Sequence, residues 1–280
     1  VLRRSAAPFK PSHERLFVLF ALAFQPLQEA LGSGQDTPVT LLLWAAGVHL
    51  ALGRRDLLAG LVFGLGVVKP QLFPLPLLFL VVTGRWRAVA GAVASGGLLV
   101  AAAWLHLGPA VFRAWGAILT SPTYLHGVRR EQLWKMHSLV ASLEALAPPA
   151  WAPAARGLGH ALALALGVVS LALAARMPSP RHAWALLAVT TVLVSPHLFS
   201  YDLALLLVPA LLLLGERWSL TLRRAALATA ALVWLSALRA SLVAGHGWPA
   251  SALAGSWTPL ALLVLGREVA RRGQRASHID

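Results

Sequence analysis

Long apolar stretches recur along the whole chain, and short polar or basic gaps separate them. Stretches of this kind are typical of helices that contact lipid, because about 20 apolar residues cross the hydrocarbon core of a bilayer. Eight stretches have this character: residues 16–31, 38–52, 57–82, 86–107, 157–175, 183–214, 222–244 and 249–265. The pattern therefore predicts an all-α integral membrane protein, a polytopic helical bundle that forms a single domain over residues 1–280.

Two of these runs are too long for one crossing, and each is interrupted near its middle. Lys69-Pro70 interrupts residues 57–82, and the sequence SPHLFSYD interrupts residues 183–214. Proline removes a backbone donor and moves the preceding residue away from the helical region. Each half is then about 12 residues long, which is the length of a re-entrant or half-spanning helix. We predict broken helices at both places.

The basic residues lie mainly in the gaps between the apolar runs. These gaps are residues 53–56, 84–87, 176–182 and 215–224, together with the tail from residue 267. The positive-inside rule places all of them, and therefore the C-terminus, on the cytoplasmic side. Both broken runs must then be hairpins that return to the side they left. The polar segments consequently open together on the extracytoplasmic face: residues 32–36, 69–71, 108–156, 195–202 and 245–249.

Composition supports lipid as the surrounding solvent. Hydrophobic residues make up 58% of the 280 residues and charged residues 12%, whereas an ordinary soluble domain has roughly 25% charged residues. A net charge of +14 would favour a nucleic-acid partner for a soluble protein. Here the basic residues set topology, so we predict the lipid bilayer as partner and no nucleic acid. Many arginines with no asparagine are typical of a GC-rich bacterial genome, which indicates a bacterial plasma membrane.

Several classes of chemistry lack the residues that they need. The chain has no cysteine, which excludes disulfides, thiol nucleophiles and Cys-ligated zinc sites. It has no Walker A, His-Glu-x-x-His or Gly-x-Ser-x-Gly sequence, so nothing supports ATP hydrolysis, zinc proteolysis or serine-hydrolase chemistry. We expect neither a metal site nor a cofactor.

Lys69 stands at the first break, beside Pro70 and Gln71. A lysine at the centre of a bilayer costs about 2.5–3.5 kcal/mol, and such residues usually have a function. One interpretation is an ammonium that faces an anionic group such as a phosphate. The other is a lysine whose long side chain extends to the membrane interface.

Two further polar segments contain candidate site residues. Gln35 and Asp36 follow a proline-bearing run, which indicates either a helix end that lines a cavity or an N-cap. His197, Tyr201 and Asp202 lie at the second break, where backbone donors of a helix N-terminus can face an anion. They are either an acid/base or phosphate-orienting set, or a cap with interfacial aromatic residues.

The long polar segment at residues 108–156 contains apolar side chains at helical spacing over residues 131–146. This pattern predicts an amphipathic helix in the outer interface. Arg129 and Arg130 precede it, and His137 flanks its apolar positions. The two arginines either extend to the membrane surface or clamp a phosphate whose lipid tail lies in the bilayer.

The sequence AGLVFGLGVVKPQLFPLPLLFLVVTGRWRA, residues 59–88, follows Gly34-Gln35. It resembles the core of the polyprenyl-phosphate-mannose-dependent mannosyltransferases of glycosyltransferase family 87. MHSLVASL at residues 136–143 and VLVSPHLFSYDLALLLVPALLLL at residues 192–214 extend the resemblance over most of the chain. The Lys-Pro pair is its most specific element, and the remainder is hydropathy and order. The resemblance implies a GT-C fold.

The resemblance also implies an activity. Such an enzyme moves mannose from a polyprenyl-phosphate donor to a glycolipid or glycan acceptor on the outer face of the membrane, with inversion. Lys69, Arg129, Arg130 and His197 would orient and neutralise the leaving phosphate. The full set of substrate-binding candidates is Gln35, Lys69, Gln71, Arg129, Arg130, His137, Ser138, His197 and Tyr201.

The catalytic base is the point at which this chain departs from the family pattern. GT-C enzymes usually keep it in the first outer loop, and no such loop with an acidic residue precedes residue 16. We expect the natural N-terminal part, with the base, to be missing. Otherwise the base is Asp36 or Asp202, or the chain is inactive.

Two other functions fit parts of the pattern. Paired broken helices are typical of secondary transporters, so a transporter or a lipid or glycan flippase is the first alternative. The loops that follow the two breaks differ greatly in length, which disfavours an internal repeat. An inactive remnant or a scaffold is the second alternative.

Overall fold

The computed structural model describes residues 11–124, 132–216, 218–243 and 257–275, and their regular structure is entirely helical. The α-helices are α1 (Pro11–Ala23), α2 (Gln25–Gly32), α3 (Thr37–Leu52), α4 (Asp56–Gly64), α5 (Pro74–Val82), α6 (Trp86–Leu107), α7 (Pro109–Thr120), α9 (Leu139–Leu146), α10 (Ala152–Ala175), α11 (Pro180–Val194), α12 (Leu207–Leu212), α13 (Leu220–Val243) and α15 (Thr258–Arg275). Short 3₁₀ helices are η1 (Leu65–Val68), η2 (Pro70–Leu72), η4 (Leu133–Lys135), η5 (Pro149–Trp151) and η6 (Ser200–Leu206). The predicted all-α class is confirmed.

Two helical segments of the described chain are long and apolar enough to cross a membrane by their own length. They are α6 and the segment Pro149–Ala175, which contains α10. Shorter apolar segments form α3 and parts of the two interrupted runs. Apolar side chains of α6 face outward, and Leu98 and Leu105 are 71% and 85% exposed. These features suggest a membrane protein.

The first interrupted run folds back on itself. It comprises α4, η1, η2 and α5, and its break lies at Lys69-Pro70. Its two ends meet, because the guanidinium of Arg85, just after α5, pairs with the carboxylate of Asp56 at the start of α4. The same guanidinium donates to the backbone carbonyl of Ala51. The predicted hairpin is therefore present, and this ion pair clasps its open end.

The second interrupted run has the same form. Helix α11 leads to the break at residues 195–199, and η6 and α12 return alongside α11. At the open end, Nε2 of His182 lies 3.2 Å from a carboxylate oxygen of Glu216. Nδ1 of His182 is 2.8 Å from the hydroxyl of Ser179. Both broken runs are thus hairpins whose ends are joined by polar side chains.

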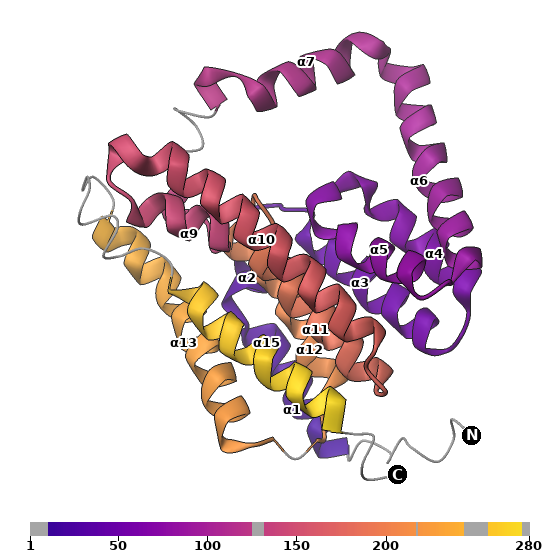
Figure 1. The fold of residues 1–280 in the computed structure, drawn as a ribbon, viewed down its shortest axis with the longest axis vertical. Coiled ribbons are helices and arrows are strands. Elements are labelled where there is room, and N and C mark those ends of the chain that lie inside the picture. The colour runs from indigo at the N-terminus through magenta and orange to yellow at the C-terminus, as the bar shows by residue number, and fades with distance from the viewer. Residues whose placement is uncertain (1–10, 125–131, 217, 244–256, 276–280) are drawn as a thin grey trace.

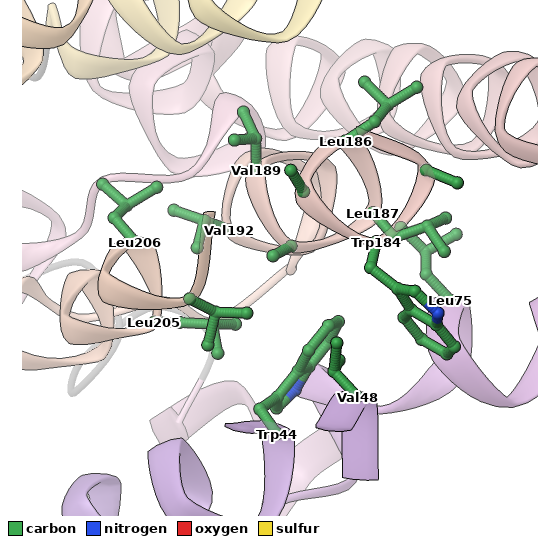
Figure 2. Close-up of a cluster of buried hydrophobic side chains, with 14 of the residues drawn as sticks. Trp44, Val48, Leu75, Trp184, Leu186, Leu187, Val189, Val192, Leu205 and Leu206 are labelled. Atoms are coloured by element: carbon green, nitrogen blue, oxygen red, sulfur yellow. The ribbon is translucent and has the colours of Figure 1, made fainter. Parts of the chain in front are cut away.

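Helix α11 is the centre of the molecule. Every residue from His182 to Leu193 is buried, and Figure 1 shows α10 and α15 packed along it. Figure 2 shows Trp184 of α11 facing the side of α3 that carries Trp44. The ring of Trp184 stacks on Phe63 of the first hairpin with centroids 5.5 Å apart, and it meets Phe79 edge-on at 5.0 Å. Aromatic packing therefore holds the two hairpins together.

Helices α4 and α6 approach closely through small residues. A Cβ atom on Gly60 would overlap the backbone of Ala88, and one on Gly64 would overlap the backbone of Ala92. The hydroxyl of Ser95 donates to the carbonyl of Leu61 across the same interface at 2.7 Å. Small residues and interhelical hydrogen bonds are typical of helix packing in membranes, where lipid is as apolar as the side chains.

Gly60→Val is expected to separate α4 from α6 and to destabilise the protein by about 1–3 kcal/mol, because the added atoms meet backbone that cannot move aside. Thermal unfolding in detergent measures the change. Gly97→Val is the matched control, since nothing lies within 4 Å of a Cβ at that position of α6. Equal unfolding temperatures for the two variants would show that the close approach is unimportant.

Two helix predictions are wrong in extent. Residues 16–31 form two helices, because α2 begins anew with Pro26 in its first turn. The last helix of the described chain, α15, begins at Thr258 and continues past the predicted end at residue 265, through the basic tail, to Arg275. Its final turns pack on the molecule, and Gly273 lies against Met177 and His182. Residues 244–256 lie outside the described part.

The predicted amphipathic helix over residues 131–146 is also wrong in extent. The helix there, α9, begins at Leu139 because the hydroxyl of Ser138 caps it, accepting from the backbone N–H of Ala141 at 3.3 Å. Before it, Met136 pairs with Phe199 in an isolated β-bridge, which keeps the chain extended. Much of this segment is buried. Among the described residues of this region, an exposed amphipathic helix is formed by α7.

Candidate functional site

The broken ends of the two hairpins are joined by a buried ion pair. The ammonium of Lys69, from the first break, lies 2.6 Å from Oδ1 of Asp202, which follows the second. The side chain of Lys69 is 9% exposed and that of Asp202 is 1% exposed. An ion pair this deeply buried needs further hydrogen bonds to offset its lost hydration.

The local backbone positions both partners of the ion pair, Lys69 and Asp202. Pro70 holds Lys69 out of the helical region, at φ −136° and ψ 65°, between η1 and η2. Asp202 lies in the first turn of η6, where its Oδ2 accepts from the backbone N–H of Phe199 at 3.4 Å. The predicted helix start at the second break is therefore occupied by the protein's own carboxylate.

The start of α3 completes the cluster. The hydroxyl of Thr37 donates to Oδ1 of Asp202 at 2.8 Å, and it accepts from the ammonium of Lys69 at 3.0 Å. The ammonium also lies 2.8 Å from Oδ1 of Asp36. Because a lysine ammonium has three N–H donors, these three oxygens account for all of them. A phosphate would have to displace one of these oxygens to reach Lys69.

Asp36 and Asp202 therefore differ in access. Asp36 stands at the N-cap position of α3, but its side chain makes no capping hydrogen bond and turns to Lys69 instead. It is 48% exposed, whereas Asp202 is enclosed. Asp36 is the carboxylate of this pair that a bound molecule can reach.

Glu29 is a site residue that the sequence analysis missed. Its Oε1 accepts from the hydroxyl of Ser200 at 2.6 Å, and its Oε2 accepts from the amide of Gln25 at 2.8 Å. It therefore lies beside the residues of the second break. The sequence does contain a signal for it, because a carboxylate inside an apolar run is itself a functional candidate, and Glu29 lies in the run over residues 16–31.

Aromatic rings border the cluster. The ammonium of Lys69 lies 5.1 Å from the ring centroid of Tyr201, within the range of a cation–π contact. Tyr201 stacks on Phe199 at 5.4 Å, and Phe199 meets His197 edge-on at 4.7 Å. The hydroxyl of Tyr124 is 3.2 Å from Nδ1 of His197, which connects the segment after α7 to the second break.

A model of glycosyltransferase family 87 matches residues 1–196. The chain belongs to glycosyltransferase family 87. The match covers Asp36, Lys69 and the helices from α1 to α11, so the resemblance inferred from the Lys-Pro sequence is confirmed. No curated protein and no solved structure matches the chain. Membership of the family indicates a glycosyltransferase.

Lys69, Asp36, Asp202 and Thr37 form the ion cluster of this family 87 chain. The remaining candidates lie outside it. His137 is fully buried, with Nδ1 3.1 Å from the hydroxyl of Thr258, and Ser138 caps α9. Gln35 and Gln71 are both half-buried. They are sequence neighbours of Asp36 and Pro70, respectively. Arg129 and Arg130 lie outside the described residues.

The cluster of this glycosyltransferase carries more carboxylates than cations. Among the described residues, Asp36 and Asp202 both contact the ammonium of Lys69. Glu29 contacts Ser200, two residues before Asp202 in the sequence. An ionised carboxylate accepts hydrogen bonds and protons, so the arrangement suits a hydroxyl group better than an anionic phosphate. Lys69 holds Asp36 and Asp202 together and limits their mutual repulsion.

Proposed function

We propose that this protein transfers a sugar, mannose by its family resemblance, from a polyprenyl-phosphate donor to the hydroxyl of a glycolipid or glycan acceptor. The transfer takes place on the outer face of a bacterial plasma membrane and inverts the configuration at C1. The observation that carries the proposal is the buried Lys69–Asp202 pair, with half-exposed Asp36 beside it. The family 87 match over residues 1–196 includes Asp36 and Lys69.

The two hairpins support the proposed sidedness. Their clasped ends lie in the basic gaps, at Arg85 and at His182, where the positive-inside rule favours the cytoplasm. The broken ends, with Lys69 and Asp202, lie at the opposite ends of the same hairpins. We infer from this arrangement a multi-pass bundle with a cytoplasmic C-terminus and a site that opens on the extracytoplasmic side.

In the proposed reaction, Asp36 acts as general base. Its carboxylate takes the proton of the acceptor hydroxyl, the freed oxygen forms a bond to the sugar C1, and the bond from C1 to the phosphate oxygen breaks with its electron pair on the phosphate. Lys69 orients Asp36 at 2.8 Å. His197 and Tyr201 border the space in which the phosphate would lie, and no nucleotide or metal is needed for these steps.

An apolar groove beside the first break fits the lipid part of the donor. It has a volume of about 340 Å³ and lies between η1, α5 and α6. Val67 and Pro70 line it near Lys69, and Val93 and Gly96 line it on α6. An isoprenoid chain in this groove would bring its phosphate to the mouth of the ion cluster, because Pro70 adjoins Lys69 in the chain.

Val93→Trp is expected to raise KM for a long-chain polyprenyl donor by roughly tenfold, because the indole fills part of the groove, and the loss of about two buried methylenes weakens binding by about 1.4 kcal/mol. Initial transfer rates against donor concentration measure the change. Val100→Trp is the matched control, since Val100 is exposed on the same helix but does not line the groove. A KM equal to that of the control would place the tail elsewhere.

The central experiment measures transfer and uptake in parallel. Proteoliposomes receive a radiolabelled polyprenyl-phospho-mannose and an extract of membrane glycolipids. Label that moves into the glycolipid fraction supports the proposed function. Label that crosses the membrane without changing its carrier supports the transporter or flippase alternative. If the folded protein shows neither transfer nor uptake, the result supports an inactive remnant or scaffold, or a base that lies outside these 280 residues.

A further inference from the structure

Helix α7 is amphipathic and has no covering partner among the described residues. None of its residues is buried. At helical spacing, one arc carries large apolar side chains and the opposite arc carries polar and small ones. The apolar arc consists of Val111, Phe112, Trp115, Ile118 and Leu119. The polar arc contains Arg113, Gly116 and Thr120.

The way in which α7 joins α6 fixes the direction of its apolar arc. Gly108 separates the two helices and has φ 74°, a conformation that glycine adopts readily. Figure 1 shows α7 running crosswise over the end of α6. The ring of Phe112 contacts the ring of Trp104, with centroids 5.2 Å apart. Because Phe112 belongs to the apolar arc, this arc faces the side on which α6 extends.

The exposed side chains of α6 indicate which medium contacts the apolar arc of α7. α6 is long and apolar enough to cross a membrane, and Leu98 and Leu105 in its second half are largely exposed. The medium that covers these side chains in a membrane protein is lipid. A helix that lies across the end of such a span, with its apolar side toward the span, meets the same lipid at its boundary with water.

We propose that α7 lies in the membrane interface, with its apolar arc in the lipid and Arg113 toward the headgroups and water. The partner is the bilayer itself, and the proposal does not depend on sugar transfer. After α7 the chain reaches Tyr124, whose hydroxyl contacts His197 at the second break. α7 thereby holds one edge of the site at the lipid surface, where a lipid-borne molecule would arrive.

Spin labelling tests this placement, and the absence of cysteine gives a clean background. Single cysteines are introduced as Val111→Cys and Ile118→Cys on the apolar arc and as Arg113→Cys and Thr120→Cys on the polar arc. All four positions are exposed or half-exposed on α7, so the substitutions leave packing intact. Each labelled protein is reconstituted into phospholipid vesicles, and collision rates with oxygen and with a water-soluble nickel chelate are measured.

The ratio of oxygen to nickel collisions is expected to be roughly tenfold higher at residues 111 and 118 than at 113 and 120, because oxygen partitions into hydrocarbon and the polar chelate does not. Leu105→Cys on α6 supplies the lipid-exposed reference. Equal, nickel-rich values at all four positions would place α7 in water and overturn the proposal. Low values for both reagents at 111 and 118 would mean that another protein surface covers the arc, which would also overturn it.

Discussion

Lys69→Met is expected to destabilise the protein by about 3–5 kcal/mol and to abolish sugar transfer, because removing one partner of a buried ion pair leaves the other charge without compensation. Asp202 is 1% exposed, so water cannot replace the ammonium. The substitution also removes the group that holds Asp36. Chemical or thermal unfolding in detergent measures the stability, and transfer of label from a polyprenyl-phospho-mannose measures the activity.

The matched control is Lys135→Met. Lys135 is exposed and its ammonium lies 4.8 Å from the ring centroid of Trp134, much as Lys69 lies over Tyr201. An exposed contact of this kind contributes about 0.5–1 kcal/mol, so the control separates the cation–π contact from the buried ion pair. Equal losses of stability in the two variants would contradict the assigned role of Asp202.

A double variant separates stability from chemistry. Lys69→Met combined with Asp202→Asn removes both charges, and it is expected to recover a large part of the lost stability, because a neutral amide is far less costly to bury than an unpaired carboxylate. Transfer is expected to stay absent, since Asp36 remains without its cation. Recovery of both stability and transfer would remove Lys69 from the reaction.

Asp36→Asn is expected to lower the rate of transfer by about 10²–10⁴-fold, because an amide cannot accept the proton of the acceptor hydroxyl. Its effect on stability is expected to be about 1 kcal/mol or less, since the side chain is half-exposed and ion pairs in contact with solvent contribute little. The measurements are kcat at saturating donor and the unfolding midpoint of the same preparation. A large fall in both would indicate a structural role only.

Asp56→Asn is the control for this prediction. Asp56 also pairs with a basic side chain, Arg85, but at the clasped end of the first hairpin and away from the site. Its replacement is expected to leave kcat unchanged. If Asp36→Asn keeps the wild-type rate as well, the base is another carboxylate, and Glu29→Gln is the next variant because Glu29 lies beside Ser200 at the second break.

Local sequence signals predicted much of the architecture. The Lys69-Pro70 break and the break before Asp202 were identified from proline and from run length, and the hairpins at both places are present. The helical class follows from apolar runs that span many turns. The family was identified from the Lys-Pro sequence and its surroundings. These features depend on residues that are close together in the chain, so a single sequence contains them.

Helix boundaries were less predictable where contacts with residues far away in the chain override the local pattern of apolar and charged residues. The apolar spacing over residues 131–146 is helical, yet Met136 pairs with Phe199 and the helix starts only at Leu139. The basic residues after 267 look like a surface tail, but α15 continues because Gly273 packs against the start of α11. In each case the contact that decides the outcome comes from a remote part of the chain.

Hydropathy, proline placement and basic gaps were sufficient to establish the helical class, the two breaks and the family, because each is a property of neighbouring residues. The partners of the site required the folded chain. Nothing near Asp36 in the sequence shows that its carboxylate leaves the helix cap for Lys69, and nothing near Lys69 shows that Asp202 neutralises it. Those pairings arise because packing around α11 brings the two hairpins together, and a buried charge is stable there only beside its counter-charge.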